Sequence, residues 1–340
     1  MALLAQLCSV GMALVHGTSI DSERGNWRKE STTAPSLLTK SCHDIDLILW
    51  LLSPASSSQE EAHQPSHVSS AGSLSYFRRS RKPEAAGNAT NCLSCPVEES
   101  CLYSAKKIYR ERHLSKAKLG WPLKILVPEI EDCVASEGFQ AAEKKLMACL
   151  SEDYDQSTTQ AEIDRRPWFG RCVYESSNDV CDDQLVTMAW DEEASTPRAE
   201  VYSGRGAKTA SIHMIAFTEK QCERRGRIYG TRGELEYDSE TIKVYDFATQ
   251  ATAVHHPQQL GGGHGGGDFG LAEAYVNAIA AVKNKVMGVE AAQRKYIGCT
   301  AKDVMRSHAM VFAAEEARTG KKVVDWKMWW EQKVEAVVKE

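Results

Sequence analysis

The sequence predicts an α+β fold in which helices pack on one face of a large, mainly antiparallel, open sheet. Between residues 184 and 247 apolar and polar side chains alternate, which is the period of a strand. The turns between these segments are short, and strands joined by short turns pair antiparallel. Before and after this region, apolar residues recur at helical spacing. These observations define the fold class.

In chain order, the first predicted element is a buried helix over residues 36–52. Residues 53–70 are rich in Ser, Pro and Gln and are expected to form a loop insertion. A short strand is predicted over 72–77 and a cysteine-containing loop over 91–101. Helical or irregular segments are expected from there to about residue 164.

The central strands and the closing helices follow from the change of period. The expected strands are 184–190, 212–216, 227–229, 234–237 and 242–247. Three helices are expected to close the chain, at 268–283, 301–318 and 326–338. Thr300 and Asp303 match a capping box, and Gly320 lies where a helix stop belongs.

Composition argues against two classes of partner. The formal charge of −5 offers no basic surface for nucleic acid or for anionic lipid, so neither partner is expected. The eleven cysteines are an odd number, and a chain of this length does not need disulfides, which favours a reducing, cytoplasmic location. Residues 1–17 resemble the apolar core of a signal peptide but lack its basic start.

The glycine-rich run from Gly261 to Gly266 satisfies the dinucleotide pattern G-x-G-x-x-G literally. The pattern requires a buried strand before it and a second strand after its helix, and the sequence supplies neither. Two interpretations stay open. The run is either a flexible linker whose Asp268 caps the next helix, or a loop that brings backbone amides and His264 close to a substrate.

The cysteines Cys92, Cys95 and Cys101 form a cluster, and C-x2-C spacing suits a soft metal such as Zn²⁺. Three ligands are one short of a closed structural site, and Cys42 or His113 would be needed to complete it. Reduced cysteines in a loop explain the pattern equally well.

Several stretches together resemble the Gfo/Idh/MocA oxidoreductase family, typified by glucose-fructose oxidoreductase and inositol dehydrogenase. They lie in the same order as in the family, and they are RGNWR (24–28), KSCHDID (40–46), CLSCPVEESCLYSAKKIY (92–109), GRCVYESSNDV (170–180), IYGTRGELEYD (228–238) and GGGHGGGDFGLAEAYVNAI (261–279). The resemblance covers residues 24–325.

The resemblance implies an oxidoreductase with NAD or NADP as cofactor, a small-molecule substrate and a homo-oligomeric assembly. The family's N-terminal Rossmann domain has no counterpart here, and neither has its Glu-Lys-Pro segment with the usual catalytic lysine. We therefore expect 24–325 to be the substrate-binding and dimerising domain, with 1–23 an unmatched remnant or product of mis-splicing. Residues 326–340 are expected to form a C-terminal helix.

The resemblance also implies catalytic residues. His43 and Asp46 match the end of the family motif D-x-G-x-H-x-x-D, while Thr39 and Ser41 replace its first two residues and Lys40 adds a cation. In the family these residues position or deprotonate a substrate hydroxyl, a role suited to histidine, which titrates near neutral pH. Without the resemblance, a packing role for His43 would be the simpler interpretation.

Substrate contacts are expected in the polar stretch before the first long strand, at Tyr174, Asn178 and Asp179. Related sequences often carry a histidine where Asp183 stands, which puts a ligand role at that position in doubt. The tryptophans of residues 326–330 are expected to pack in a core or interface, since no basic groove accompanies them.

Three functions follow from these observations. The first is hydride transfer between a nicotinamide and a hydroxyl or carbonyl of a sugar-like or polyol-like molecule, with His43, Asp46 and Lys40 handling the proton. The second is a truncated, inactive module that dimerises or binds a ligand. The third is a glycosidase that uses bound NAD, which needs the same absent domain.

Overall fold

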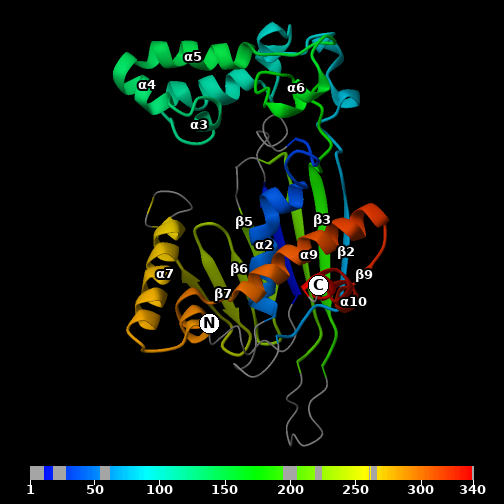
Figure 1. The fold of residues 1–340 in the computed structure, drawn as a ribbon, viewed down its shortest axis with the longest axis vertical. Coiled ribbons are helices and arrows are strands. Elements are labelled where there is room, and N and C mark those ends of the chain that lie inside the picture. Colours follow the sequence, from blue (N-terminus) through cyan, green and yellow to red (C-terminus); the bar gives the residue numbers. More distant parts are fainter. Residues whose placement is uncertain are drawn as a thin grey trace, which may run out of the picture.

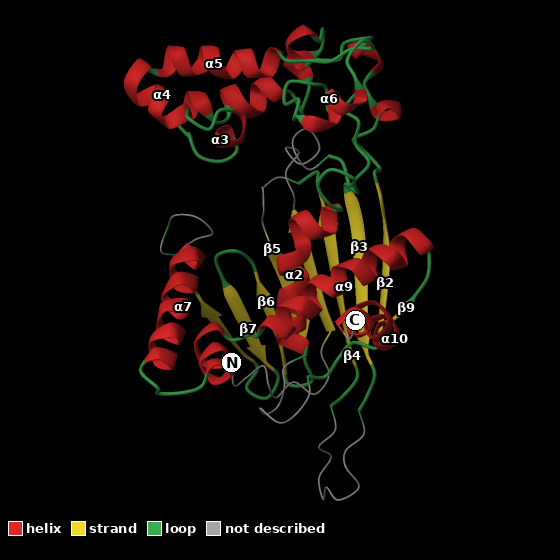
Figure 2. Ribbon diagram, viewed as in Figure 1, coloured by secondary structure: helices red, strands yellow, loops and turns green. Residues whose placement is uncertain are grey.

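The computed structural model describes residues 11–17, 28–53, 62–193, 205–218, 224–259, 261 and 266–338, with the backbone alone for 11–17. A nine-stranded sheet has helices against one face, and a helical lobe lies beyond one end of it (Figures 1 and 2). The α+β class expected from the sequence is therefore confirmed.

The strands of the described residues form one sheet. In chain order they are β1 (Gly11–Gly17), β2 (His67–Ser73), β3 (Asp183–Trp190), β4 (Lys208–Ile215), β5 (Arg224–Tyr229), β6 (Gly233–Tyr237), β7 (Ile242–Asp246), β8 (Ala251–His255) and β9 (Val324–Asp325). Their order across the sheet is β8-β7-β6-β5-β1-β4-β3-β2-β9. Neighbouring strands are antiparallel except β1 and β4, which run parallel.

Of the strands that differ from the expectation, β1 and β2 depart from it most. β1 lies within the N-terminal segment that matched nothing in the family, yet it occupies a place inside the sheet between β4 and β5. β2 begins at His67, inside the segment expected to be a loop, and ends at Ser73 rather than continuing to residue 77. The reason is tertiary, because β3 and β9 pair with the β2 backbone although only Val68 of this strand is buried.

The described residues form helical segments of three kinds (Figure 2). The α-helices are α2 (Ser36–Leu52), α3 (Leu123–Leu126), α4 (Ile130–Glu137), α5 (Phe139–Ser151), α6 (Gln160–Arg165), α7 (Gly267–Lys283), α8 (Val289–Ala292), α9 (Ala301–Gly320), α10 (Trp326–Trp330) and α11 (Ala336–Val338). Wider π-turns occur in η6 (Lys106–Glu111), η9 (Gln293–Ile297) and η10 (Glu331–Glu335). The short 3₁₀ turns are η2 (Arg79–Arg81), η3 (Glu84–Ala86), η4 (Cys92–Ser94), η5 (Glu98–Ser100) and η7 (Leu114–Lys116).

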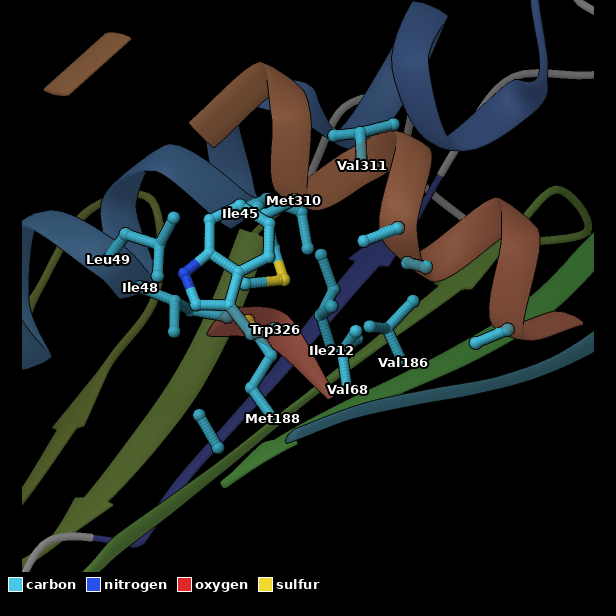
Figure 3. Close-up of a cluster of buried hydrophobic side chains, with 14 of the residues drawn as sticks. Ile45, Ile48, Leu49, Val68, Val186, Met188, Ile212, Met310, Val311 and Trp326 are labelled. Carbon is cyan, nitrogen blue, oxygen red and sulfur yellow. The ribbon is translucent and has the colours of Figure 1, made fainter. Parts of the chain in front are cut away.

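The main core lies where α2 and α9 cross the sheet (Figure 3). Ile45 and Ile48 of α2 belong to one buried cluster with Val186 of β3 and Ile212 of β4. The side chains of β3 alternate between buried and exposed, because only one of its faces meets the helices. Burial of this face therefore sets the register of the central strands.

The C-terminal segment belongs to the same core. Trp326 is buried, and its ring stacks on Trp329 with 5.8 Å between centroids. The expected packing role of the tryptophans is therefore confirmed. The capping box at the start of α9 is also confirmed, since the Thr300 hydroxyl accepts from the Asp303 amide and Asp303 accepts from the Thr300 amide.

The end of α9 differs from the expectation. Gly320 is the last residue of the helix, and Lys321 adopts the left-handed conformation with φ 49°. The amide of Lys322 donates to the Ala317 carbonyl, which closes the helix in the way a left-handed residue permits.

A buried carboxylate holds the chain where it leaves the sheet for the helical lobe. Asp182 is fully buried immediately before β3. It accepts hydrogen bonds from the amides of Ser75, Tyr76 and Phe77 at 2.7–2.9 Å, and a fourth from the Ser75 hydroxyl. The lobe that follows has its own apolar core around Tyr109, Leu123 and Leu146.

We expect Asp182→Ala to lower the free energy of unfolding by at least about 3 kcal/mol, because three backbone amides lose their acceptor and each unsatisfied buried donor costs about 1–3 kcal/mol. Urea unfolding followed by circular dichroism measures the change. Asp191→Ala removes an exposed carboxylate just beyond the other end of β3 and should change stability by less than about 0.5 kcal/mol. Equal losses in both variants would contradict the anchoring role.

A second buried polar group lies at the opposite end of β3. His63 is 1% exposed, and its Nε2 donates to the Asp191 carbonyl at 2.9 Å while Nδ1 has no hydrogen-bond partner. The His63 carbonyl accepts from Trp190 Nε1 at 3.2 Å. Burial lowers the pKa of His63 from its usual 6.5, and the nearby positive charge of Lys208 lowers it further.

This lowered pKa makes folding sensitive to acid. Because the unfolded chain binds a proton at His63 more readily than the folded chain does, the free energy of unfolding should fall as the pH drops below 6.5. Urea titrations between pH 5 and 8 test the slope. His63→Gln keeps a donor for the Asp191 carbonyl but does not titrate, so its slope below pH 6.5 should be shallower than that of the wild type.

Candidate active site

The outer surface of α2 presents the three candidate catalytic residues together. Lys40, His43 and Asp46 are three residues apart, which places them along one face of the helix. His43 is exposed, whereas Lys40 and Asp46 are half-buried. The structure therefore brings these side chains onto one accessible stripe, on the side of α2 away from the sheet.

The opposite face of α2 is held to the sheet by an ion pair. The carboxylate of Asp44 is buried, and its Oδ1 accepts from Arg224 Nε of β5 at 2.6 Å. Burial raises the pKa of Tyr237 on β6, and the negative charge of Asp44 raises it further. Asp44 thus fixes how α2 is rotated, and this rotation directs the preceding residue, His43, outward.

Two thiols lie close to Asp46. Burial raises the pKa of Cys42 and of Cys299, and the negative charge of Asp46 adds to the rise in both. Both thiols are therefore held in the neutral form near neutral pH, which disfavours a thiolate nucleophile beside His43. The chemistry available on the α2 stripe is that of an imidazole, a carboxylate and an ammonium group.

The predicted substrate-contact stretch reaches the beginning of α2. The Ser36 hydroxyl donates to the Cys181 carbonyl at 2.7 Å, which ties residues 174–181 to the first turn of the helix. His43 lies seven residues further, a rise of about 10 Å along the helix axis. The stretch and the α2 stripe are therefore neighbours along one helix.

Within this stretch, the three residues predicted to contact the substrate make their contacts with other residues of the protein. Tyr174 is 4% exposed in a cluster with Tyr76 and Tyr103, and burial and its hydrogen bond with Tyr76 raise its pKa. The Asn178 amide donates to the Phe77 carbonyl at 3.3 Å. Asp179 Oδ1 accepts from the Glu30 amide at 2.7 Å. Asn178 Oδ1 is buried without a partner.

Sequence reasoning missed a histidine–carboxylate pair on the other face of the sheet. His213 Nε2 of β4 lies 2.8 Å from Asp183 Oδ1 of β3, and both side chains are more than a third exposed. Asp183, which stands where related sequences often carry a histidine, is thus paired with one. The alternation along β4 would have placed His213 on this face, but the diagonal pairing depends on the register of two strands.

Of the two interpretations of the cysteine cluster, the structure favours reduced cysteines in a loop. The described residues contain no group of three or more His, Cys, Asp or Glu side chains that could hold a metal ion. Cys92 points into the core of the helical lobe, where its sulfur accepts from the Ala105 amide at 3.4 Å. Cys101 lies instead beside the tyrosine cluster, where it contributes, less than burial does, to the raised pKa of Tyr103 and Tyr174. Cys92 and Cys101 therefore lie in different surroundings although they are close together in the sequence.

The described residues do not fit a nicotinamide dinucleotide. Among them the one parallel strand pair is β1 with β4, and the chain between these strands includes β2, β3 and the helical lobe rather than a single crossover helix. His264, predicted to approach the substrate, lies outside the described residues. Asp268 falls in the first turn of α7, and the cap position is taken by Gly266 in the left-handed conformation. Within the described chain, no helix combines the length and the hydrophobicity needed to cross a bilayer.

Comparisons with known proteins give structural likeness at low identity. No family model and no curated protein matches the chain. Against an oxidoreductase domain protein from Kribbella flavida the identity is 12% and the TM-score 0.47, over 95% of this chain and 60% of that one. The super-repressor mutant of Gal80p from Saccharomyces cerevisiae gives 10% and 0.46, over 96% and 60%. A levoglucosan dehydrogenase in complex with NADH and levoglucosan gives 12% and 0.43, over 95% and 59%. The chain thus spans less than two thirds of the length of each of these proteins.

The two faces of α2 can be separated by substitution of adjacent residues. We expect His43→Ala to change the free energy of unfolding by less than about 0.5 kcal/mol because the side chain is exposed. Asp44→Ala should lower it by about 3 kcal/mol or more, since it leaves the partly buried Arg224 without its carboxylate. Urea unfolding of both variants measures this. A large loss for His43→Ala would show a structural role for that residue.

Proposed function

We propose that this chain is the substrate-binding part of an NAD(P)-dependent oxidoreductase acting on a hydroxyl or carbonyl of a sugar-like or polyol-like molecule. The observation that carries the proposal is the α2 stripe. His43 and Asp46, which match the end of the family motif, share one accessible helix face with the cation of Lys40. Assembly as a homo-oligomer and a cytoplasmic location accompany the proposal.

In this proposal the chain's own residues handle the proton. The His43 imidazole accepts the proton of a substrate hydroxyl as the carbon is oxidised, and returns it in the reverse direction. Asp46, one turn further along α2, stabilises the resulting imidazolium, and Lys40 on the other side favours a developing alkoxide. Asp44 acts through the helix, as a positioning residue.

The nicotinamide supplies hydride chemistry when it is bound, and the described residues offer no fold to hold it. Another part of the polypeptide or another protein has to supply the nucleotide site. A second function is a module that binds a ligand or dimerises without catalysis. The absence of a dinucleotide-binding unit from the described chain favours this alternative.

Ligand titration of the full chain distinguishes the two functions. We expect one class among glucose, myo-inositol and lactate to bind saturably in the millimolar range by isothermal titration calorimetry. We also expect His43→Ala to weaken that binding at least about tenfold, because a hydrogen-bonding group of the site is lost. Asp191→Ala serves as a matched control on the exposed surface and should bind like the wild type.

NADH fluorescence completes the test. Substrate binding without NADH binding supports a substrate-binding half whose nucleotide is held elsewhere. Saturable micromolar NADH binding supports the oxidoreductase with a nucleotide site in this chain. If neither ligand binds to correctly folded protein, the oxidoreductase proposal is wrong and the inactive module is favoured.

A further inference from the structure

Helix α7 is apolar on two opposite faces, and the described chain covers only one of them. The inner face carries Ala278 and Ala281, each 6% exposed, which pack with Ala292 of α8 and the neighbouring η9. The helix itself lies at an edge of the molecule, well away from α2 and α9 (Figure 1). Small residues therefore attach α7 to the domain while its other side faces outward.

The outer face carries large apolar side chains that are mostly exposed. Phe269 is 65% exposed, Val276 63% and Ile279 50%, and Tyr275 beside them is 59% exposed. A helix whose apolar residues surround it is expected to lie between two packed layers. A contiguous exposed apolar surface of this kind is typical of an interface with another molecule.

The spacing of the residues on the outer face of α7 indicates what kind of element could pack against it. Positions 269, 272, 276, 279 and 283 are separated alternately by three and four residues, which is the a/d spacing of a coiled coil. Ala278 and Ala281 fall at the c and f positions opposite this seam, in agreement with their contact with α8 and η9. The expected occupant is therefore another helix with a matching seam.

Charge decides which helix fits. The N-terminal half of α7 carries Asp268 and Glu273, whereas Lys283 and Lys285 stand at its C-terminal end. Two copies packed parallel would place like charges together. Two antiparallel copies place the acidic half of each helix against the basic end of the other, and they also oppose the helix dipoles.

We propose that α7 is an interface between two copies of this chain, packed antiparallel about a two-fold axis near Asn277. Val276 then contacts the partner subunit's Ile279, and the same contact repeats across the axis because a two-fold interface is self-complementary. Glu273 approaches the partner's Lys283. This interface specifies the homo-oligomer that accompanies the proposed function, and because none of its residues belongs to the α2 stripe, dimerisation and ligand binding can be tested separately.

Sedimentation equilibrium of the full chain measures the dimer. We expect a reversible dimer in the wild type and at least about a tenfold higher dissociation constant in Val276→Glu, because the dimer would bury a carboxylate in its seam from each copy. Val323→Glu is the matched control, since Val323 is 63% exposed beside β9 and outside the seam. Both variants should keep the wild-type circular dichroism spectrum and unfolding midpoint.

Charge reversal tests the antiparallel arrangement separately, with exposed residues whose substitution leaves the fold intact. Lys283→Glu alone should weaken the dimer several-fold, and Lys283→Glu combined with Glu273→Lys should restore it. A wild-type chain that stays monomeric, or a dimer that Val276→Glu and Val323→Glu affect equally, would overturn the proposal. Failure of the double variant to recover would overturn the antiparallel pairing.

Discussion

One-sided burial of the sheet is the constraint on which the rest of the structure depends. The side chains of β3 and β4 that face α2 and α9 are almost completely buried, while those on the other face are exposed or half-exposed. A slip of one residue in either strand would exchange the two faces, so the register cannot drift. This register fixes α2 over β4 and β1, and it also places His213 next to Asp183.

Two buried carboxylates convert this packing into defined geometry. Asp182 binds three consecutive amides where the chain leaves the sheet, and so determines how the helical lobe begins. Asp44 binds Arg224 beneath α2, and so determines which helix face is accessible. Buried carboxylates are tolerated because charge-assisted hydrogen bonds replace the water they lose. Neither residue was singled out in the sequence, where both look like ordinary polar positions beside candidate functional residues.

Much of the candidate site was accessible to sequence reasoning because it lies within single elements. The helical spacing of 36–52 predicted α2 with its observed bounds, and three-residue spacing was enough to place Lys40, His43 and Asp46 together. The cysteines show the limit of spacing as an argument. Cys92 and Cys101 are close in sequence, yet the loop turns one sulfur into a core and the other toward tyrosines.

Local pattern by itself determined the α+β class, the helix that carries the candidate site, the capping box of α9 and most of the central strands. These features depend on residues a few positions apart, where periodicity and capping act directly. Only the tertiary structure decided that residues 11–17 and 67–73 are strands, that Asp44 pairs with Arg224, and that His213 meets Asp183. The reason is physical: strand pairing and buried ion pairs join residues far apart in the chain, and their energy comes from the partner rather than from the local sequence.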